Sequence, residues 1–297
     1  MAESLSQTKG RKTRSMEEPE SFSHDFSSLL SEDLLLCPIC VYVLTDPVTT
    51  PCGHNFCNSC LTWCWDKSQH CLCPLCNQKF NKRPELKINT TLREVADYFK
   101  KKRVSTELKR IQQYAVDVTL DPDTAHPDLI LSADGKQVTY GDTQQNLPDT
   151  QQRLNPCICV LGKQSFSSGR FYYEVQVRGK TEWTLGVVRG NINRKGEMIL
   201  TPQDGLWTVI LRNKDQYKAC PGPPVLITLR EKVEVVGVFV DYEEGLVSFY
   251  DVKSRSHIYS FTDQSFTEKL YPYFSPDLNN EGKNSAPLII SPVFKTE

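Results

Sequence analysis

The pattern of apolar and polar residues becomes strand-like from about residue 116 onward. In the segment FYYEVQVR (171–178), Tyr173, Val175 and Val177 fall on one face and polar residues on the other. Further strand-like segments, bounded by Gly, Pro, Asn and Asp, span 183–188, 206–212, 224–229, 233–242, 246–252 and 257–261. The stretch DYEEGLVSF within them predicts a tight hairpin. Many short strands without helices between them predict an all-β sandwich.

The pattern before this region is different. Residues 1–27 are polar and charged and predict a disordered leader, and SLLSEDLLL (28–36) predicts a short amphipathic helix. A second helix is expected in NTTLREVADYFKKKR, which lies within a helical linker over 85–114. Its predicted start is a capping box at Thr91–Glu94. The apolar stripe of this helix is Leu92, Val95, Ala96 and Phe99. Together with Leu108 and Ile111 it offers two to three heptads at most, too few for a coiled coil, and these two residues alternatively extend the helix into the β domain.

Composition narrows the class of protein. The 297 residues are 39% hydrophobic and 24% charged, with a net charge of -1, which is typical of a soluble protein and gives no general attraction to nucleic acid or anionic lipid. We find neither a signal peptide nor a membrane span, so a cytoplasmic location with reduced thiols is expected. The basic residues within 9–14 are a solvated tail or, alternatively, a nuclear address.

Nine of the twelve cysteines lie within residues 37–76. Seven of the nine and one histidine form four pairs with metal-ligand spacing, in the order Cys37, Cys40, Cys52, His54, Cys57, Cys60, Cys73, Cys76. A redox motif needs only one such pair, and a disulfide framework needs an oxidising compartment. Eight Cys and His ligands are enough for two closed tetrahedral sites, so the block predicts two structural zinc ions.

The remaining cysteines have no ligand partners in the sequence. Cys71 competes with Cys73 for a ligand position, but only Cys73 repeats the CP-x-C context of the first pair. We interpret Cys64 and Cys71 as spare thiols. Three further cysteines are interpreted as packing residues: Cys157, Cys159 and Cys220.

The segment LLLCPICVYVLTDPVTTPCGHNFCNSCL, followed by CPLCNQKF and NTTL, resembles the RING finger of tripartite-motif proteins. In a RING finger the first and third ligand pairs bind one zinc ion, and the second and fourth pairs bind the other. The resemblance therefore implies one zinc on Cys37, Cys40, Cys57 and Cys60. It implies a second zinc on Cys52, His54, Cys73 and Cys76. It also implies ubiquitin ligase activity, in which the domain positions a ubiquitin-loaded conjugating enzyme and forms no covalent intermediate.

Carried over by position, Ile39 and Pro74 would contact the conjugating enzyme, although both residues could simply pack around the zinc loops. Trp63 and Trp65 are expected near the same surface or in the core. Many active RING fingers carry an arginine directly after the last ligand, and this chain has Asn77 there, which brings no charge and a shorter reach. The departure puts the strength of catalysis in doubt.

The segment VDVTLDPDTAHPDLILSADGKQV and the strand-like segments after it resemble a PRY–SPRY (B30.2) module, here expected over 115–297. Such modules bind protein targets through loops at one end of the sandwich. Four positions correspond to a target pocket mapped in relatives: Thr184, Ile210, Arg212 and Leu278. Arg212 is either an anchor for an acidic partner or a solvated strand-edge arginine.

The resemblance predicts a small zinc-stabilised α+β RING finger over 28–84, a short helical linker and an all-β SPRY sandwich. The B-box and long coiled coil usual between these modules are missing, although RING fingers could still pair weakly through 29–36 and 92–99. We expect a RING-type E3 ubiquitin ligase whose SPRY domain recruits a protein target, with a role in innate immunity suggested by related proteins. The alternative is a non-catalytic adaptor or antagonist of longer relatives, and a zinc-dependent nucleic-acid binder is disfavoured by the neutral charge.

Overall fold

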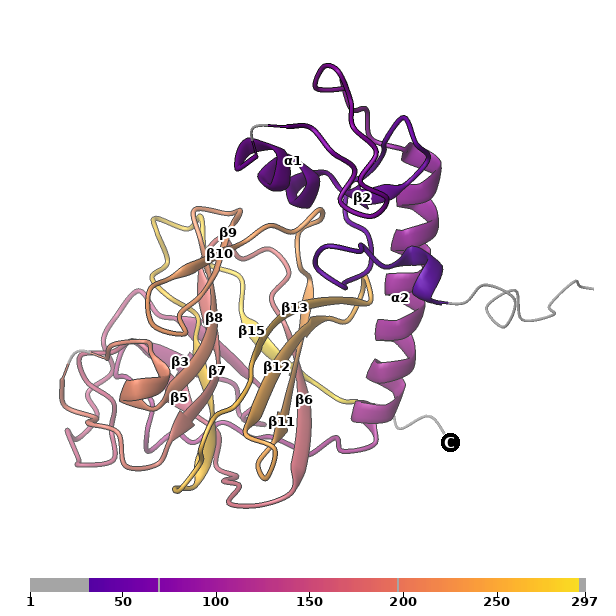
Figure 1. The fold of residues 1–297 in the computed structure, drawn as a ribbon. Coiled ribbons are helices and arrows are strands. Elements are labelled where there is room, and N and C mark those ends of the chain that lie inside the picture. Colours follow the sequence, from indigo (N-terminus) through magenta and orange to yellow (C-terminus); the bar gives the residue numbers. More distant parts are fainter. Residues whose placement is uncertain (1–31, 69, 197, 294–297) are drawn as a thin grey trace, which may run out of the picture. The chain divides into compact units, whose positions relative to one another are not determined.

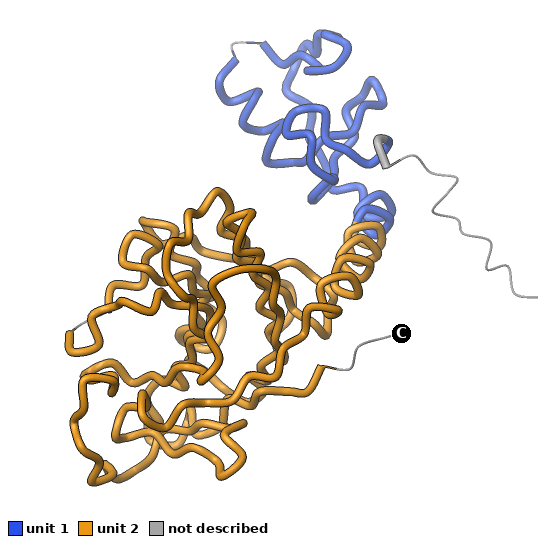
Figure 2. Tube along the Cα trace, turned by 90° about the horizontal axis from the view of Figure 1, so that it is seen from below, with its two compact units in different colours: residues 1–96 blue, residues 97–297 orange. Residues whose placement is uncertain are grey.

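The computed structural model describes residues 32–68, 70–196 and 198–293. The predicted leader lies outside the described residues. Of the predicted helix over 28–36, the described part contains a short 3-10 helix, η2 (Glu32–Leu35). The chain divides into two compact units, residues 1–96 and 97–297, shown in different colours in Figure 2. Among the described helices, none combines the length and the apolar character that crossing a membrane requires.

The first unit is small and has little regular structure. It contains the antiparallel pair β1 (Pro47–Thr49) and β2 (Asn55–Cys57), the helix α1 (Asn58–Asp66) and the first turns of α2 (Thr90–Gln112). The buried apolar side chains of its core include Leu44, Val48, Phe56, Leu61, Trp65 and Ala96. A core of this size does not stabilise a domain by burial alone, so further cross-links are expected.

The predicted capping box of α2 is wrong. The side-chain Oδ1 of Asn89 accepts a hydrogen bond from the backbone N–H of Leu92 at 3.0 Å, so Asn89 caps the helix and not Thr91. Asn89 also accepts at its backbone carbonyl from the N–H of Arg93 at 2.9 Å. An asparagine side chain reaches the free N–H groups of the first turn as well as a threonine does, and local sequence does not choose between the two.

The second unit is a sandwich of two antiparallel sheets, visible in Figure 1. The six-stranded sheet has the order β10 (Val225–Ile227), β9 (Gln216–Ala219), β8 (Leu206–Arg212), β7 (Trp183–Arg189), β14 (Leu270–Ser275), β5 (Val160–Leu161). The seven-stranded sheet has the order β13 (Ser256–Phe261), β12 (Leu246–Asp251), β11 (Val235–Asp241), β6 (Arg170–Gln176), β15 (Leu288–Ser291), β4 (Gln137–Tyr140), β3 (Leu129–Leu131). A 3-10 helix, η3 (Pro202–Asp204), precedes β8.

The core between the sheets follows the alternation seen in the sequence. Tyr173, Val175 and Val177 all lie in it and are 1% exposed or less. The predicted hairpin is the β11–β12 pair, in which Asp241 faces Leu246. Its turn requires glycine, because Gly245 has a φ of 61° and a Cβ atom there would lie 1.8 Å from the carbonyl oxygen of Gln264. The all-β fold is therefore confirmed.

The second half of α2 covers the outer face of the seven-stranded sheet. Leu108 and Ile111 are buried against three aromatic side chains of that face, Tyr172, Phe239 and Tyr250. Polar contacts fix the same surface, because the Tyr250 hydroxyl donates to Glu107 at 2.7 Å and the Gln112 amide donates to Glu174 at 2.9 Å. The helix therefore extends into the β domain instead of forming a coiled coil. The boundaries predicted for the linker and the SPRY domain remain predictions.

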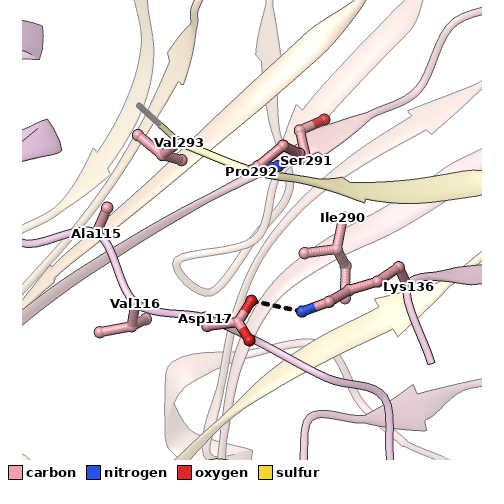
Figure 3. A pocket seen from close by; sticks show the side chains of 8 residues that line it. All are labelled: Ala115, Val116, Asp117, Lys136, Ile290, Ser291, Pro292 and Val293. Carbon is pink, nitrogen blue, oxygen red and sulfur yellow. Dashed lines mark hydrogen bonds and ion pairs between the residues drawn. The ribbon is translucent and has the colours of Figure 1, made fainter. Parts of the chain in front are cut away.

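A pocket of about 430 Å³ lies where the chain after α2 passes the end of β15. It is lined by Ala115, Val116, Asp117, Lys136, Ile290, Ser291, Pro292 and Val293. Figure 3 shows the ion pair between Asp117 and Lys136, at 2.5 Å, on one side of it. Lys136 also donates to the Val118 carbonyl at 2.5 Å, so this lysine is held by the protein itself.

Candidate functional site

The structure gathers the eight ligand candidates of the first unit into two clusters. One is formed by Cys37, Cys40, Cys57 and Cys60, and the other by Cys52, His54, Cys73 and Cys76. Within each cluster all four ligand atoms lie within 4.8 Å of one another. These are the same two sets that the RING resemblance implies, with the sequence pairs interleaved.

Two of the pairs are held by backbone turns of the same design. After Cys37, the N–H of Val41 donates back to the Cys37 carbonyl at 2.8 Å. After Cys73, the N–H of Asn77 donates to the Cys73 carbonyl, also at 2.8 Å. Each turn aims two thiols at one point, and the residue that follows the second cysteine takes a left-handed conformation that lets the chain leave the turn. We call these turns the first and second zinc knuckles.

The β1–β2 hairpin and α1 position the remaining ligands. Cys52 and His54 lie in the loop between the strands, where Gly53 has a φ of 86° that glycine adopts without strain. Cys57 ends β2 and Cys60 lies in the first turn of α1. The hairpin therefore contributes to both clusters and links them mechanically.

The spacing of the ligand atoms fits zinc. A tetrahedral zinc ion with ordinary Zn–S and Zn–N bonds requires about 3.8 Å between two sulfurs and about 3.5 Å between a sulfur and a nitrogen. In the second cluster, the Sγ atoms of Cys52 and Cys76 lie 3.7 Å apart. The Nδ1 atom of His54 lies 3.4 Å from the Sγ of Cys52 and 3.5 Å from that of Cys73. Each cluster can therefore hold one zinc ion, with His54 binding through Nδ1.

Neighbouring groups orient the ligands. The buried Thr50 hydroxyl lies 3.1 Å from Cys52 Sγ and donates to the His54 carbonyl at 3.0 Å. In the first cluster, the backbone N–H of Thr45 donates to Cys57 Sγ at 3.2 Å. Burial is the largest influence on the Cys57 thiol and raises its pKa to about 12. Its deprotonation at neutral pH therefore depends on metal binding.

The spare cysteines and the tryptophans of this unit have distinct places. Cys64 and Cys71 are half-buried and belong to neither cluster. Trp65 is a core residue whose indole N–H donates to the Leu72 carbonyl at 2.8 Å. Trp63 is 57% exposed, with the Lys67 ammonium 4.4 Å from the centre of its ring. Of the two locations predicted for the tryptophans, Trp65 therefore occupies the core and Trp63 the surface.

The three residues proposed to contact a conjugating enzyme lie on the zinc knuckles. Ile39 is half-buried and packs against the zinc-module core, whereas Pro74 and Asn77 are exposed. The knuckles also expose Val41, Tyr42 and Leu75, which are 71%, 77% and 54% accessible. These three residues were not predicted from the sequence; the available signal was their position, since Val41 and Tyr42 directly follow the pair Cys37–Cys40 and Leu75 lies between Cys73 and Cys76.

The four residues of the predicted target pocket lie in or beside the six-stranded sheet. Thr184 in β7 faces Ile210 in β8, and both are buried. Arg212 at the end of β8 donates to the Thr184 hydroxyl at 3.1 Å. Leu278, in the loop after β14, is 45% exposed. The fold therefore brings Thr184, Ile210 and Arg212 together.

Arg212 is held by the protein itself. Its guanidinium forms an ion pair with Asp277 at 2.9 Å and donates to the backbone carbonyls of Trp183 and Leu211. The Arg212 side chain is still 31% exposed, so its two predicted roles, an anchor for an acidic partner or a solvated arginine, both stay predictions. Asp277 was missed because the two residues lie far apart in the sequence and no local pattern joins them.

Comparison with known proteins identifies three segments. Residues 37–72 match the family of RING-type zinc fingers, 118–166 the SPRY-associated PRY domain, and 170–289 the SPRY domain. Pyrin from Homo sapiens is 49% identical over 187 residues, covering 63% of this chain and 24% of Pyrin. Zinc finger protein RFP from Homo sapiens is 46% identical over 187 residues, covering 63% of this chain and 36% of RFP.

Solved structures agree on the fold of the second unit. A crystal structure of the TRIM65 PSpry domain aligns with a TM-score of 0.53 at 21% identity, over 62% of this chain and 94% of that one. The structure of stonustoxin aligns with a TM-score of 0.52 at 24% identity, over 60% of this chain and 29% of that one. At such identities the likeness concerns the fold alone. The chain spans about a quarter to a third of the length of the two curated relatives named above.

Proposed function

Because the chain is a tripartite-motif-like protein with an N-terminal RING finger and a C-terminal PRY–SPRY module, we propose that it is a RING-type E3 ubiquitin-protein ligase. The observation that carries the proposal is the pair of complete ligand clusters, whose knuckles expose apolar side chains instead of burying them. Exposed apolar side chains such as Val41, Tyr42 and Leu75 are not needed to hold zinc, and they are typical of a surface that binds another protein.

The proposed mechanism is positioning. Zinc supplies structural cross-links and takes no part in the reaction. Ile39, Pro74 and the apolar residues around them bind the conjugating enzyme, and this contact holds its ubiquitin thioester within reach of a lysine amine on the target. The amine attacks the thioester carbonyl, a C–N bond forms, the C–S bond breaks, and the leaving thiolate of the conjugating enzyme takes up the proton that the amine loses. No residue of this chain is required to take or give a proton.

The SPRY domain is proposed to select the target. Its surface at the end of β8 and in the loop after β14 presents Leu278 in a fixed framework, because the Asn284 side chain donates to the carbonyls of Pro276 and Leu278 within this loop. Three further hydrogen bonds of the same side chain tie the loop to Thr181 and Glu182, just before β7. Because the Arg212 guanidinium is already paired with Asp277, it is less available to bind a carboxylate of the target. We therefore propose that recognition of the target includes other contacts as well. A role in innate immunity and a cytoplasmic location belong to the same proposal and rest on the family resemblance and the reduced cysteines.

The second candidate function is a non-catalytic adaptor. Asn77 favours it, since an asparagine after the last ligand cannot supply the charge of the arginine found in many active RING fingers. The described residues between the last ligand and the PRY segment favour it as well. They hold one helix and no further Cys/His cluster, so the long coiled coil that dimerises relatives is not built there.

The test is single-turnover discharge of ubiquitin from a charged conjugating enzyme onto free lysine, with the full chain and a panel of enzymes. Acceleration that Ile39→Ala abolishes supports the ligase. Ile88→Ala is the matched control, because Ile88 is 39% exposed and lies outside the knuckles. No acceleration with any enzyme would contradict the ligase.

A second comparison separates the two candidates. Asn77 has a left-handed φ of 59°, so Asn77→Arg introduces backbone strain together with charge. Asn77→Ala introduces the strain alone and serves as its control. If the native chain is inactive while Asn77→Arg is active and Asn77→Ala is not, the natural protein is an adaptor. Light scattering on the same samples tests the proposed weak pairing of RING fingers.

A further inference from the structure

Two cysteines outside the zinc module meet a buried tyrosine hydroxyl. Cys157 is half-buried and Cys159 is fully buried, just before β5. The Cys157 Sγ lies 3.4 Å from the hydroxyl of Tyr273 in β14, and Tyr273 is 1% exposed. These residues border a small apolar cluster separate from the main core of the sandwich.

The backbone brings the two thiols toward each other. The N–H of Cys159 donates to the carbonyl of Cys157 at 2.9 Å, so the chain makes a three-residue turn at Ile158. Such a turn shortens the separation of the first and third residues relative to an extended strand. The Cys159 thiol also points back toward Cys157 and donates a hydrogen bond to its carbonyl oxygen at 3.5 Å. The turn therefore keeps the two cysteines side by side, and a disulfide between them requires the Cys159 thiol to rotate from the Cys157 carbonyl toward the Cys157 sulfur.

The two sulfurs differ in their surroundings. The largest influence on the pKa of Cys157 is hydrogen bonding from Cys159, followed by burial, which acts in the opposite direction, and by hydrogen bonding from Tyr273. The two hydrogen-bonding effects together outweigh burial and lower the pKa of Cys157 to about 7. Burial raises the pKa of Cys159 well above its usual range. The partly accessible sulfur is thus the more readily ionised of the two, and the inaccessible one is the less readily ionised. That division suits a nucleophile and a resolving thiol.

We propose that Cys157 is a reversible oxidation site for hydroperoxides and that Cys159 resolves it as an intramolecular disulfide. The Cys157 thiolate attacks a peroxide oxygen, an S–O bond forms, the O–O bond breaks, and hydroxide leaves and takes a proton to become water. The Cys159 sulfur then attacks the Cys157 sulfur and an S–S bond forms. The S–O bond breaks and the oxygen leaves as a second water. Two thiols are oxidised and one hydrogen peroxide is reduced to two waters.

The site lies next to the predicted target pocket. The carbonyl of Ile158, between the two cysteines, accepts a hydrogen bond from the Ser275 hydroxyl at 2.6 Å. Ser275 is the last residue of β14 and faces Thr184 in β7. A change in the turn at Ile158 therefore acts on the strand end that leads into Asp277 and Leu278.

The test uses the full zinc-loaded chain, a small molar excess of hydrogen peroxide, rapid alkylation of free thiols and mass spectrometry of each cysteine peptide. Cys220 is the internal reference, because it is a buried cysteine of the same unit and burial raises its pKa. We expect a disulfide between Cys157 and Cys159 that a thiol reductant such as glutathione reverses. We also expect Cys157 to be alkylated at neutral pH roughly tenfold faster than Cys220.

Variants distinguish a specific redox pair of Cys157 and Cys159 from nonspecific oxidation of an accessible thiol. In Cys159→Ser, Cys157 should stop at sulfenic acid, which a 1,3-diketone probe traps. Tyr273→Phe should move the pH midpoint of Cys157 alkylation upward without loss of the thermal unfolding transition. The proposal is overturned if Cys157 is alkylated no faster than Cys220, or if peroxide produces no disulfide between the pair. It is also overturned if sulfenic acid is no more abundant in Cys159→Ser than in the native chain.

Discussion

Val41 and Asn77 occupy the same position in the two zinc knuckles, and both have a left-handed backbone, with φ values of 62° and 59°. Each follows the second cysteine of its turn. Asparagine tolerates this conformation, whereas a β-branched residue is strained in it. The two knuckles are thus alike in backbone and unlike in how well the side chain suits it.

Val41→Asn should stabilise the zinc module by about 1 kcal/mol, because it removes the strain of a β-branched residue at positive φ. Little packing is lost, since Val41 is 71% exposed. The reciprocal change Asn77→Val should destabilise the module by a similar amount. Thermal unfolding of the zinc-loaded protein measures both. Equal unfolding midpoints for the two variants would contradict this account of the strain.

Replacing one zinc ligand should unfold the first unit and spare the second. Cys57→Ser removes a buried ligand of the first cluster, and the hairpin that carries it also carries Cys52 and His54. We expect fewer than two zinc ions per chain and loss of one of two thermal transitions. Cys64→Ser is the control and should retain two zinc ions, because Cys64 is in neither cluster. A Cys57→Ser protein with two zinc ions and both transitions would disprove the assignment.

The second half of α2 should contribute to the stability of the SPRY unit. Leu108→Ala removes a side chain buried against Tyr172 and Phe239 and should cost about 2–4 kcal/mol. Thr106→Ala, on the exposed side of the same helix, should cost less than about 0.5 kcal/mol. Urea unfolding monitored for the β-sheet signal compares them. Similar midpoints for both variants would mean that the helix does not dock in solution.

The stability of the SPRY unit should fall in mild acid. Burial lowers the pKa of His126, against the opposing effect of Asp128, and desolvation by its neighbours lowers that of His257, although the His257 side chain keeps part of its surface exposed. In the folded state His126 Nδ1 accepts a hydrogen bond from the N–H of Asp128 at 3.2 Å, which requires an unprotonated nitrogen. The unfolded chain therefore binds more protons below about pH 6.5, and folding free energy is lost as the pH falls through that value.

The measurement for this prediction is the urea midpoint between pH 7.5 and 5.5. Each histidine can account for at most about 1.5 kcal/mol over that range. His126→Asn places an amide oxygen near the position of Nδ1 and should reduce the slope while leaving the part that belongs to His257. A native protein whose midpoint rises as the pH falls would contradict the sign of both shifts.

Gly186 should not tolerate a side chain. A Cβ atom there would lie 2.0 Å from the carbonyl oxygen of Trp207 in the neighbouring strand β8. Gly186→Ala should therefore cost more than about 3 kcal/mol or prevent folding. Gly222→Ala is the matched control, because a Cβ atom at Gly222 meets nothing within 4 Å. Equal soluble yield and equal unfolding midpoints for the two variants would disprove the clash.

Much of this protein follows from short-range pattern. The zinc ligands are readable because each pair needs only one turn of backbone, as in Cys37–Cys40 and Cys73–Cys76. Strands such as β6 are readable because side chains alternate across a sheet, which places Tyr173 and Val175 in the core. Both signals depend on residues a few positions apart, so the sequence alone was enough for them.

Tertiary structure decided the features that join distant residues. The outer face of β6 is buried because α2 docks there, which brings Gln112 to Glu174. Arg212 is paired because the loop after β14 returns Asp277 to the end of β8. The sulfur of Cys157 lies beside a buried hydroxyl because β14 carries Tyr273 there. Which partner reaches a given side chain depends on how the sheets and loops fold back on one another, and periodicity along the chain carries no information about that.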